Sequence, residues 1–218
     1  MSKILSENQI RDLAKQFNVE YPAVRAVLEV ESSGSGFAAD GNPTILFEPH
    51  IFWKELDKKN YKSLKLKMQA IEPTLLYPKW RTYPYGPSSK QWVRMQTAAN
   101  LVFKALPELN VCNTNDAKIA SDVQEAAWCS ASWGLGQVMG FHWKALGYAS
   151  IYEFVEKMRE SEANQLDCML RFCKMNNLIP KLQTYDWAGF ARGYNGANYA
   201  VNKYDQKLKA AYNKFKGK

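Results

Sequence analysis

The stretch that most constrains this chain is residues 27–48, where an apolar helical run stops abruptly. The run extends to Val30, and a Ser- and Gly-rich segment at 32–36 follows, which favours a turn over a helix interior. Glu31 lies at this break, at the C-terminal end of the predicted helix. The helix dipole repels negative charge there, and apolar neighbours disfavour the charged form, so both effects raise the pKa of Glu31. A general acid working near neutral pH needs a raised pKa.

The segment after the turn predicts a short β-hairpin over residues 37–47, with its own turn at 40–43. It carries two more carboxylates, Asp40 in the turn and Glu48 directly after the second strand. A helix-end glutamate followed by an acid-bearing hairpin suits an enzyme that splits a sugar polymer between two carboxyl groups. The alternative interpretation of Glu31 is a solvated surface group that precedes an ordinary loop.

The rest of the chain predicts one mostly helical domain, residues 1–218, without internal repeats, a flexible linker or a separate wall-binding domain. Ser6 begins a capping box, and Pro22 and Pro49 suit the first turns of two further helices. Apolar residues at helical spacing predict the remaining helices over 90–106, 116–128, 141–146, 150–178 and 202–216. Residues 60–89 contain four prolines and are predicted to be an irregular excursion.

The net charge of +8, from 29 basic and 21 acidic residues, predicts an anionic partner such as nucleic acid, a membrane surface or an anionic cell wall. Nucleic acid is the least favoured of the three, because the sequence has no helix-turn-helix signature and no Arg-rich stripe. The four cysteines form no Cys-x-x-Cys pair and there are two histidines, so neither a metal nor a cofactor is predicted. The cysteines are expected to be reduced and buried, and both histidines to be structural.

The first residues of the sequence lack the pattern of a signal peptide, and no apolar run is long enough to span a membrane. The prediction is a protein made in the cytoplasm.

Three separated motifs carry a resemblance: Glu31-Ser32, then Gly134-Leu-Gly-Gln137, then Ala191-Arg-Gly-Tyr-Asn-Gly196. In this order they resemble the lysozyme superfamily, especially goose-type lysozymes and soluble lytic transglycosylases. Residues 31–53, with Asp-Gly-x-Pro and Leu-Phe-Glu-x-His-x-Phe, resemble more closely the N-acetylmuramidase domain of bacteriophage endolysins. The resemblance covers nearly the full chain. It implies a mainly α, lysozyme-like α+β fold, a helical bundle with one small β-hairpin beside the catalytic cleft.

The resemblance also implies an activity, hydrolysis of the β-1,4 bond between N-acetylmuramic acid and N-acetylglucosamine in peptidoglycan. Glu31 is then the general acid that protonates the glycosidic oxygen. Gln137, Tyr194 and Asn195 are the implied substrate-binding residues. The alternative for Gln137 is a hydrogen bond that stabilises its loop, and the alternative for Tyr194 and Asn195 is a helix-terminal turn.

The sequence departs from the transglycosylase pattern in two places. Arg-Gly separates Ala191 from Tyr194, and a second carboxylate, Glu48, follows the hairpin, whereas transglycosylases typically work with one acid. This favours hydrolysis, in which a second carboxylate activates water. The alternative is a lytic transglycosylase that releases 1,6-anhydro products.

Two residues compete for the role of second carboxylate. Asp40 lies where an Asx-turn is the ordinary structural explanation. Glu48 follows an apolar strand, and its alternative role is to cap the helix that begins at Pro49.

The amphipathic segment 202–216 carries five lysines. They are expected either to form a solvated face or to hold the protein on anionic wall or outer-membrane surfaces. A monomer is expected. The resemblance implies release through a holin-type pore and action on the cell wall in the periplasm.

Overall fold

The computed structural model describes residues 3–31, 35–81, 86, 88–109 and 116–217. Three parts of the chain discussed above lie outside the described residues: residues 32–34 of the predicted Ser- and Gly-rich turn at 32–36, part of the proline-rich stretch, and Cys112. The chain forms two compact units. The first comprises residues 1–37, 134–138 and 157–218, and the second comprises residues 38–133 and 139–156.

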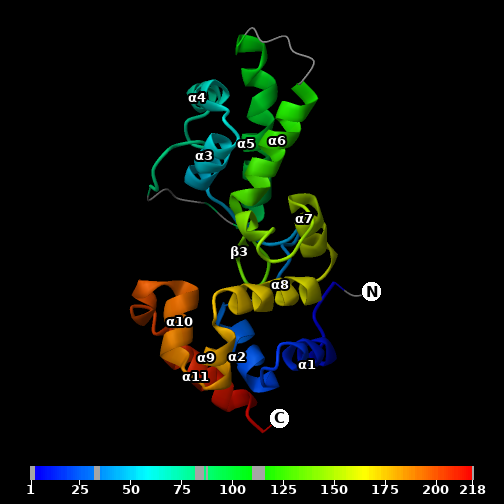
Figure 1. The fold of residues 1–218 in the computed structure, drawn as a ribbon, viewed down its shortest axis with the longest axis vertical. Helices are drawn as coiled ribbons and strands as arrows, with labels where there is room; N and C mark the ends of the chain where they lie inside the picture. Colours follow the sequence, from blue (N-terminus) through cyan, green and yellow to red (C-terminus); the bar gives the residue numbers. More distant parts are fainter. Residues whose placement is uncertain (1–2, 32–34, 82–85, 87, 110–115, 218) are drawn as a thin grey trace. The chain divides into compact units, whose positions relative to one another are not determined.

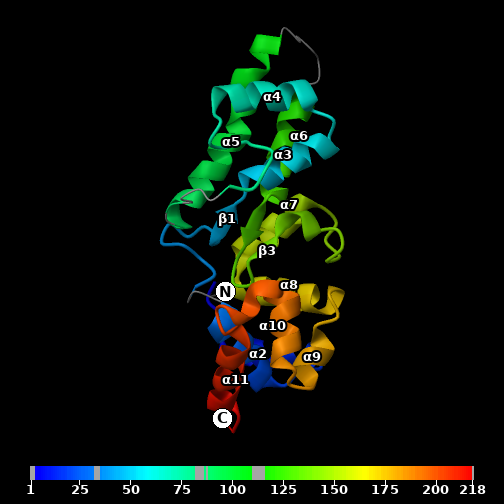
Figure 2. The same ribbon diagram turned by 90° about the vertical axis from the view of Figure 1, so that its left-hand side faces the viewer.

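The first unit is helical. Its elements are α1 (Glu7–Gln16), α2 (Tyr21–Glu31), α8 (Glu162–Met175), α9 (Ile179–Gln183), α10 (Trp187–Asn195), a 3₁₀ turn at Ala197–Ala200 and α11 (Tyr204–Phe215). In Figures 1 and 2, α11 runs beside α2, and α8 crosses above α2 and α9. One apolar core joins these helices, with contributions from Ile10, Val27, Leu170, Phe190 and Leu208.

Two helix boundaries in this unit follow from local chemistry. The Ser6 side chain accepts from the backbone N–H of Gln9, and the Gln9 side chain accepts from that of Ser6, so the predicted capping box at α1 is confirmed. Pro22 lies in the first turn of α2, where its missing N–H costs nothing, and α2 ends at Glu31 as predicted.

The second unit combines helices with a small sheet. Its elements are β1 (Ile45–Phe47), α3 (Pro49–Lys58), α4 (Lys62–Ile71), α5 (Gln91–Ala105), α6 (Asp116–Cys129) and β2 (Ala131–Trp133), with 3₁₀ turns at Ser88–Lys90, Pro107–Leu109 and Gly140–His142. Figure 1 shows α5 and α6 side by side, with α3 and α4 against them. The strand β3 (Val138–Met139) and the helix α7 (Ile151–Glu160) each cross the boundary between the units.

The strands pair differently from the predicted hairpin. β1 pairs antiparallel with β2, Ile45 opposite Trp133 and Phe47 opposite Ala131, in a three-stranded sheet of order β1-β2-β3. The turn itself forms, because the N–H of Ala38 donates to the carbonyl of Asn42 at 2.8 Å. The segment after the turn, β1, pairs with β2, which lies far along the sequence. Turn residues in the sequence do not indicate such a distant partner. The mainly α, lysozyme-like α+β class is confirmed.

Two further predictions need correction. Residues 62–71 form the helix α4, although an irregular segment was predicted there. Leu64 and Met68 are buried at helical spacing, but Leu66 is 57% exposed and obscures that pattern in the sequence. Residues 141–146 do not form a helix, and a single 3₁₀ turn at Gly140–His142 stands in its place.

The cysteines of the described residues behave as predicted. Cys129, Cys168 and Cys173 are free, buried thiols. Burial raises the pKa of Cys129 to about 12 and raises that of Cys173 as well, so both are protonated at neutral pH. None of the helices in the described ranges combines the length and the apolar character needed to cross a membrane.

A single buried amide, that of Gln165 on α8, joins three backbone segments of the first unit. Its Oε1 accepts from the N–H of Leu135 at 3.0 Å, and its Nε2 donates to the carbonyls of Gly36 at 3.1 Å and Met158 at 2.9 Å. The side chain is 1% exposed. These bonds connect the backbone that follows Glu31 to the loop 134–137.

Glu162, one helical turn earlier on α8, supports the same region. Its carboxylate accepts from the N–H of Gly36 at 2.8 Å and from that of Leu5 at 2.9 Å. It is the first residue of α8, where the helix dipole favours a negative charge.

Close packing around Gln165 explains why the first position of the Gly-Leu-Gly-Gln motif is a glycine. Gly134 has a φ of +64°, and a Cβ there would come within 2.6 Å of the Gln165 side chain. Any other residue at this position would therefore meet both backbone strain and a steric clash.

We predict that Gln165→Leu lowers the free energy of unfolding by about 2–5 kcal/mol, because three buried backbone groups lose their partner. Gln183→Leu is the matched control. Gln183 is an exposed amide with one hydrogen bond, to the carbonyl of Asn18, so the same change there is expected to cost less than about 1 kcal/mol. Urea denaturation followed by circular dichroism measures both values, and equal losses would contradict the role given to Gln165.

Candidate functional site

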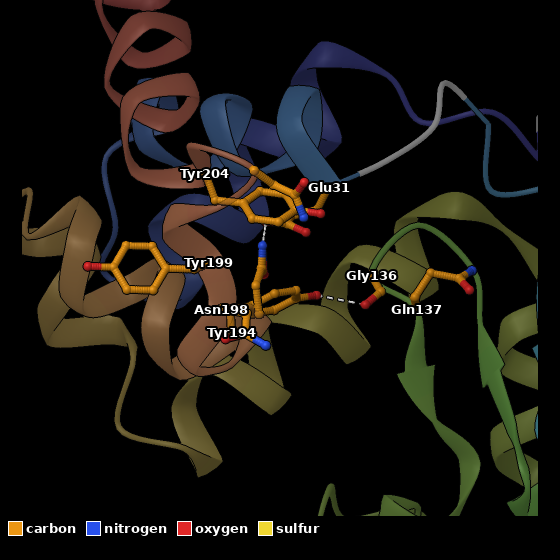
Figure 3. Close-up of a pocket in the computed structure, with 9 residues that line it drawn as sticks. Glu31, Gly136, Gln137, Tyr194, Asn198, Tyr199 and Tyr204 are labelled. Carbon is orange, nitrogen blue, oxygen red and sulfur yellow. Dashed lines mark hydrogen bonds between the residues drawn. The ribbon is translucent and has the colours of Figure 1, made fainter. Parts of the chain in front are cut away.

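A pocket of about 420 Å³ lies in the first unit, where the C-terminal end of α2 meets the residues that end α10 and begin α11. Figure 3 shows its lining side chains. The pocket is lined by Glu31, Gly136, Gln137, Tyr194, Asn195, Asn198, Tyr199, Asn202 and Tyr204. All four predicted site residues of this unit are among them, although they are up to 164 positions apart in the sequence.

Glu31 is the one carboxylate among these nine described residues. It is the last residue of α2 and is partly buried. Burial raises the pKa of its carboxyl to about 7, and the positive charge of Lys207 opposes the shift. The predicted rise in pKa is thus confirmed, with loss of hydration as its main cause. At neutral pH the group is protonated in about half of the molecules, as general acid catalysis requires.

Asn195, the last residue of α10, fixes the orientation of Glu31. Its Nδ2 donates to Glu31 Oε1 at 3.0 Å, the dashed line near Glu31 in Figure 3. An amide N–H on one carboxyl oxygen favours the acidic proton on the other, Oε2. The structure therefore joins Asn195 to the acid itself, where the resemblance implied a contact with substrate.

Tyr194 and Gly136 connect the second and third sequence motifs. The Tyr194 hydroxyl donates to the carbonyl of Gly136 at 2.7 Å. Burial raises the pKa of this phenol well above its usual value, so it stays neutral and remains a donor. Gly136 is required at this contact, because a Cβ there would lie 2.8 Å from the Met169 side chain and 3.0 Å from the Tyr194 hydroxyl.

Gln137 lines the pocket from an exposed bend with a φ of +46°. Its Nε2 donates to the carbonyl of Gly134 at 2.8 Å, which corresponds to the loop-stabilising role considered for it. Gly196 has a φ of +85° and ends α10, so the helix-terminal turn considered for Tyr194 and Asn195 is present too. The turn and the pocket are compatible, because the last turn of α10 presents both side chains to the pocket.

Five lining residues were not predicted as site residues: Gly136, which lies within the Gly-Leu-Gly-Gln motif, and Asn198, Tyr199, Asn202 and Tyr204. The last four follow Gly196 and make up half of the stretch 197–204. Asparagine amides and tyrosine rings are suited to sugar hydroxyls and sugar faces. This local enrichment in asparagine and tyrosine could have indicated these residues from the sequence.

Asp40 and Glu48 belong to the second unit, so the structure does not join them to the pocket described here. Asp40 is exposed and forms the expected Asx-turn, accepting from the N–H of Asn42 at 3.0 Å. That bond holds the pKa of Asp40 below its usual value.

Glu48 has a different environment. It occupies the N-cap position of α3 but makes no side-chain capping bond, so the capping role considered for it is absent. A carboxylate oxygen lies 3.3 Å from His50 Nδ1, and both side chains are largely buried. Burial lowers the pKa of His50, while the nearby Glu48 partly opposes the shift, so the imidazole is neutral at pH 7. Glu48 therefore lies beside a neutral, buried ring.

A metal centre has no counterpart in the part of the chain that the structure describes, since no three His, Cys, Asp or Glu side chains are grouped there to hold an ion. The chemistry available to the pocket is that of one acid with a raised pKa, an amide that orients it, and a wall of tyrosine and asparagine side chains.

Comparison with known proteins identifies the family. The family model described as N-acetylmuramidase matches residues 20–216. The crystal structure of the Burkholderia AP3 phage endolysin is similar, with a TM-score of 0.80 and 34% sequence identity over 99% of this chain and 73% of the endolysin chain. No curated protein matched. The chain therefore belongs to the N-acetylmuramidase family, a family of muramidases that degrade peptidoglycan.

Proposed function

We propose that this protein is a phage endolysin that hydrolyses the β-1,4 bond between N-acetylmuramic acid and N-acetylglucosamine. The observation that carries the proposal is the Glu31 carboxyl, with its pKa raised to about 7, in a pocket of tyrosine and asparagine side chains. We propose further that residues 1–218 act as a single catalytic domain.

In this mechanism Glu31 protonates the glycosidic oxygen from Oε2 as the bond to the leaving sugar breaks. Asn195 keeps the carboxyl in the orientation for that transfer through its bond to Oε1. Tyr194 holds the loop 134–137 against α10 and so keeps the wall of the pocket in place. The sugar rings are bound by the tyrosine and asparagine side chains of the lining.

For the second carboxylate we favour Glu48 over Asp40. Asp40 is exposed and its oxygens are engaged by Asn42. Glu48 is largely buried and is not used to cap α3. A carboxylate with those properties is suited to activating water or to stabilising an oxocarbenium-like transition state.

A lytic transglycosylase remains the second candidate, because one observation favours it. Among the described residues that line the pocket, Glu31 is the only carboxylate, and a transglycosylase works with one acid. In that reaction the sugar's own hydroxyl replaces water and a 1,6-anhydro product forms.

The surface partner we propose is an anionic wall or outer-membrane surface. The apolar face of α11 is buried through Leu208, Ala211, Tyr212 and Phe215, and the lysines of this helix are exposed. The same proposal places the protein at the cell wall after passage through a holin-type pore.

Glu31→Gln is expected to lower wall-lysis activity by about 10²–10⁴-fold, because the amide cannot donate the proton. The parent activity is expected to fall as the pH rises through about 7, where Glu31 loses its proton. Turbidity clearing of purified walls across pH measures both effects. Clearing by the variant at the parental rate would contradict the assignment of the acid.

Glu31→Gln is also expected to unfold less readily than the parent protein, by an amount that depends on pH. The pKa of Glu31 is higher in the folded than in the unfolded protein, so its stabilising contribution is complete below about pH 4.5 and is lost as the pH rises through about 7. Glu31→Gln lacks this loss and is expected to be more stable than the parent at pH 8 by about 1–3 kcal/mol, with the difference shrinking towards pH 4.5. Thermal denaturation at both pH values measures it, and an equal difference at the two values would contradict the burial argument.

The reaction type and the second carboxylate are tested together. Mass spectrometry of released muropeptides is expected to find reducing ends, which are heavier than 1,6-anhydro ends by one water. Glu48→Gln is expected to lose activity at unchanged thermal stability, and Asp40→Asn to keep its activity. Anhydro products with full activity in both variants would establish the transglycosylase reaction instead.

Binding to anionic surfaces is expected to depend on lysines of α11 and of its two cap positions that form no ion pair in the described ranges. Replacing Lys203, Lys209 and Lys216 by Gln is expected to reduce cosedimentation with wall fragments at low salt by severalfold, and 0.5 M salt is expected to have the same effect on the parent, because screening shortens the range of surface charges. Parental cosedimentation of the triple variant would make these lysines a solvated face only.

A further inference from the structure

A second cavity, a groove of about 520 Å³, runs along the surface where α2 and α11 pack. It is lined by Glu29, Val30, Lys207, Ala210, Ala211 and Lys214. Val30 and Ala211 provide an apolar floor, and the two lysines provide a cationic rim. None of these residues contacts the substrate in the mechanism proposed above, although the charge of Lys207 lowers the pKa of Glu31.

The groove adjoins the catalytic pocket on both of its helices. On α2, Glu29 and Val30 line the groove and the next residue is Glu31. On α11, Tyr204 lines the pocket, and Lys207, one helical turn later, lines the groove with its ammonium 5.4 Å from the Tyr204 ring centroid. A ligand that leaves the pocket along these helices therefore enters the groove.

The two lysines differ in their charge balance. Lys214 Nζ binds both oxygens of Glu29, at 3.0 and 2.8 Å, so these two charges largely cancel. Lys207 is exposed, and within the described part of the chain no carboxylate lies at ion-pair distance from it. Among the described residues, the groove thus presents one cation without an ion-pair partner, above an apolar floor. Such a surface suits an acidic peptide better than a neutral sugar.

We propose that this groove binds the acidic stem peptide that N-acetylmuramic acid carries on its lactyl group, with Lys207 contacting a peptide carboxylate. The inference rests on the proposed function, because that activity places a peptide-bearing sugar next to Glu31. The pocket, with its amides and tyrosines, recognises the glycan, and the groove recognises the substituent. Lys207 is then a residue that determines specificity for peptide-bearing strands over bare strands.

The test compares two soluble substrates, glycan strands that carry stem peptides and the same strands stripped of peptide by an amidase. The measured quantity is the ratio of kcat/KM for the peptide-bearing strands to kcat/KM for the bare strands. The assays are run at about pH 5, where Glu31 is protonated with or without the Lys207 charge, so that the pKa of the acid does not affect the ratio.

Lys207→Gln is expected to lower this ratio by about tenfold, the loss typical of one charge-assisted hydrogen bond. Most of the change is expected in KM for the peptide-bearing strands, and 0.5 M salt is expected to lower the parental ratio similarly. Lys207→Arg is expected to restore most of the ratio. Lys15→Gln changes an exposed lysine in the last turn of α1 that lines neither the groove nor the pocket. It removes the same charge, is the matched control and is expected to keep the parental ratio.

The outcomes separate the inference from the proposed function. A parental ratio of one, or an equal ratio in Lys207→Gln and the parent, overturns the inference while cleavage of both substrates supports the proposed function. A folded parent protein that cleaves neither substrate overturns the proposed function itself. An equal loss in Lys207→Gln and Lys15→Gln would assign the effect to net charge and would also overturn the inference.

Discussion

The site depends on the buried amide of Gln165. Its hydrogen bonds join three backbone segments that are separate in the sequence. They are the segment after Glu31, at the Gly36 carbonyl, the loop 134–137, at the Leu135 N–H, and the last part of α7, at the Met158 carbonyl. A buried amide with all its partners confers a unique arrangement, because every alternative leaves polar groups unpaired at a cost of about 1–3 kcal/mol each. The loop then presents the Gly136 carbonyl to Tyr194.

The acid itself is the result of competing effects on one carboxyl. Removal from water raises the pKa of Glu31, and the charge of Lys207 lowers it, with a net value of about 7. The bond from Asn195 orients the group. Because Lys207 also faces the groove along α11, its ammonium has two consequences: it moderates the acidity of Glu31, and under our inference it recognises the substituent of the sugar. A ligand carboxylate on Lys207 would weaken its effect on Glu31.

Local patterns were sufficient for much of the fold. The capping box at Ser6, the boundaries of α2 and the amphipathic helix α11 were all predicted, because each depends on residues within a few positions of one another. The prediction was wrong at α4, where the exposed Leu66 disguised the helical period, and in the pairing of β1, whose partner lies about 86 residues later. Pairing of distant strands leaves no local signature.

For the site, the sequence by itself determined the candidate acid. A glutamate at the end of an apolar helix is expected to have a raised pKa because of the residues next to it in the sequence. The residues around it were indicated by three motifs, through their resemblance to the lysozyme superfamily. Only the tertiary structure decided that Asn195 binds Glu31, that Tyr194 binds the loop and that Lys207 acts on the acid. The bond between Asn195 and Glu31 alone joins residues 164 positions apart. The geometry of all three interactions is set by how α2, α10 and α11 pack, a property of the whole core and not of any one segment.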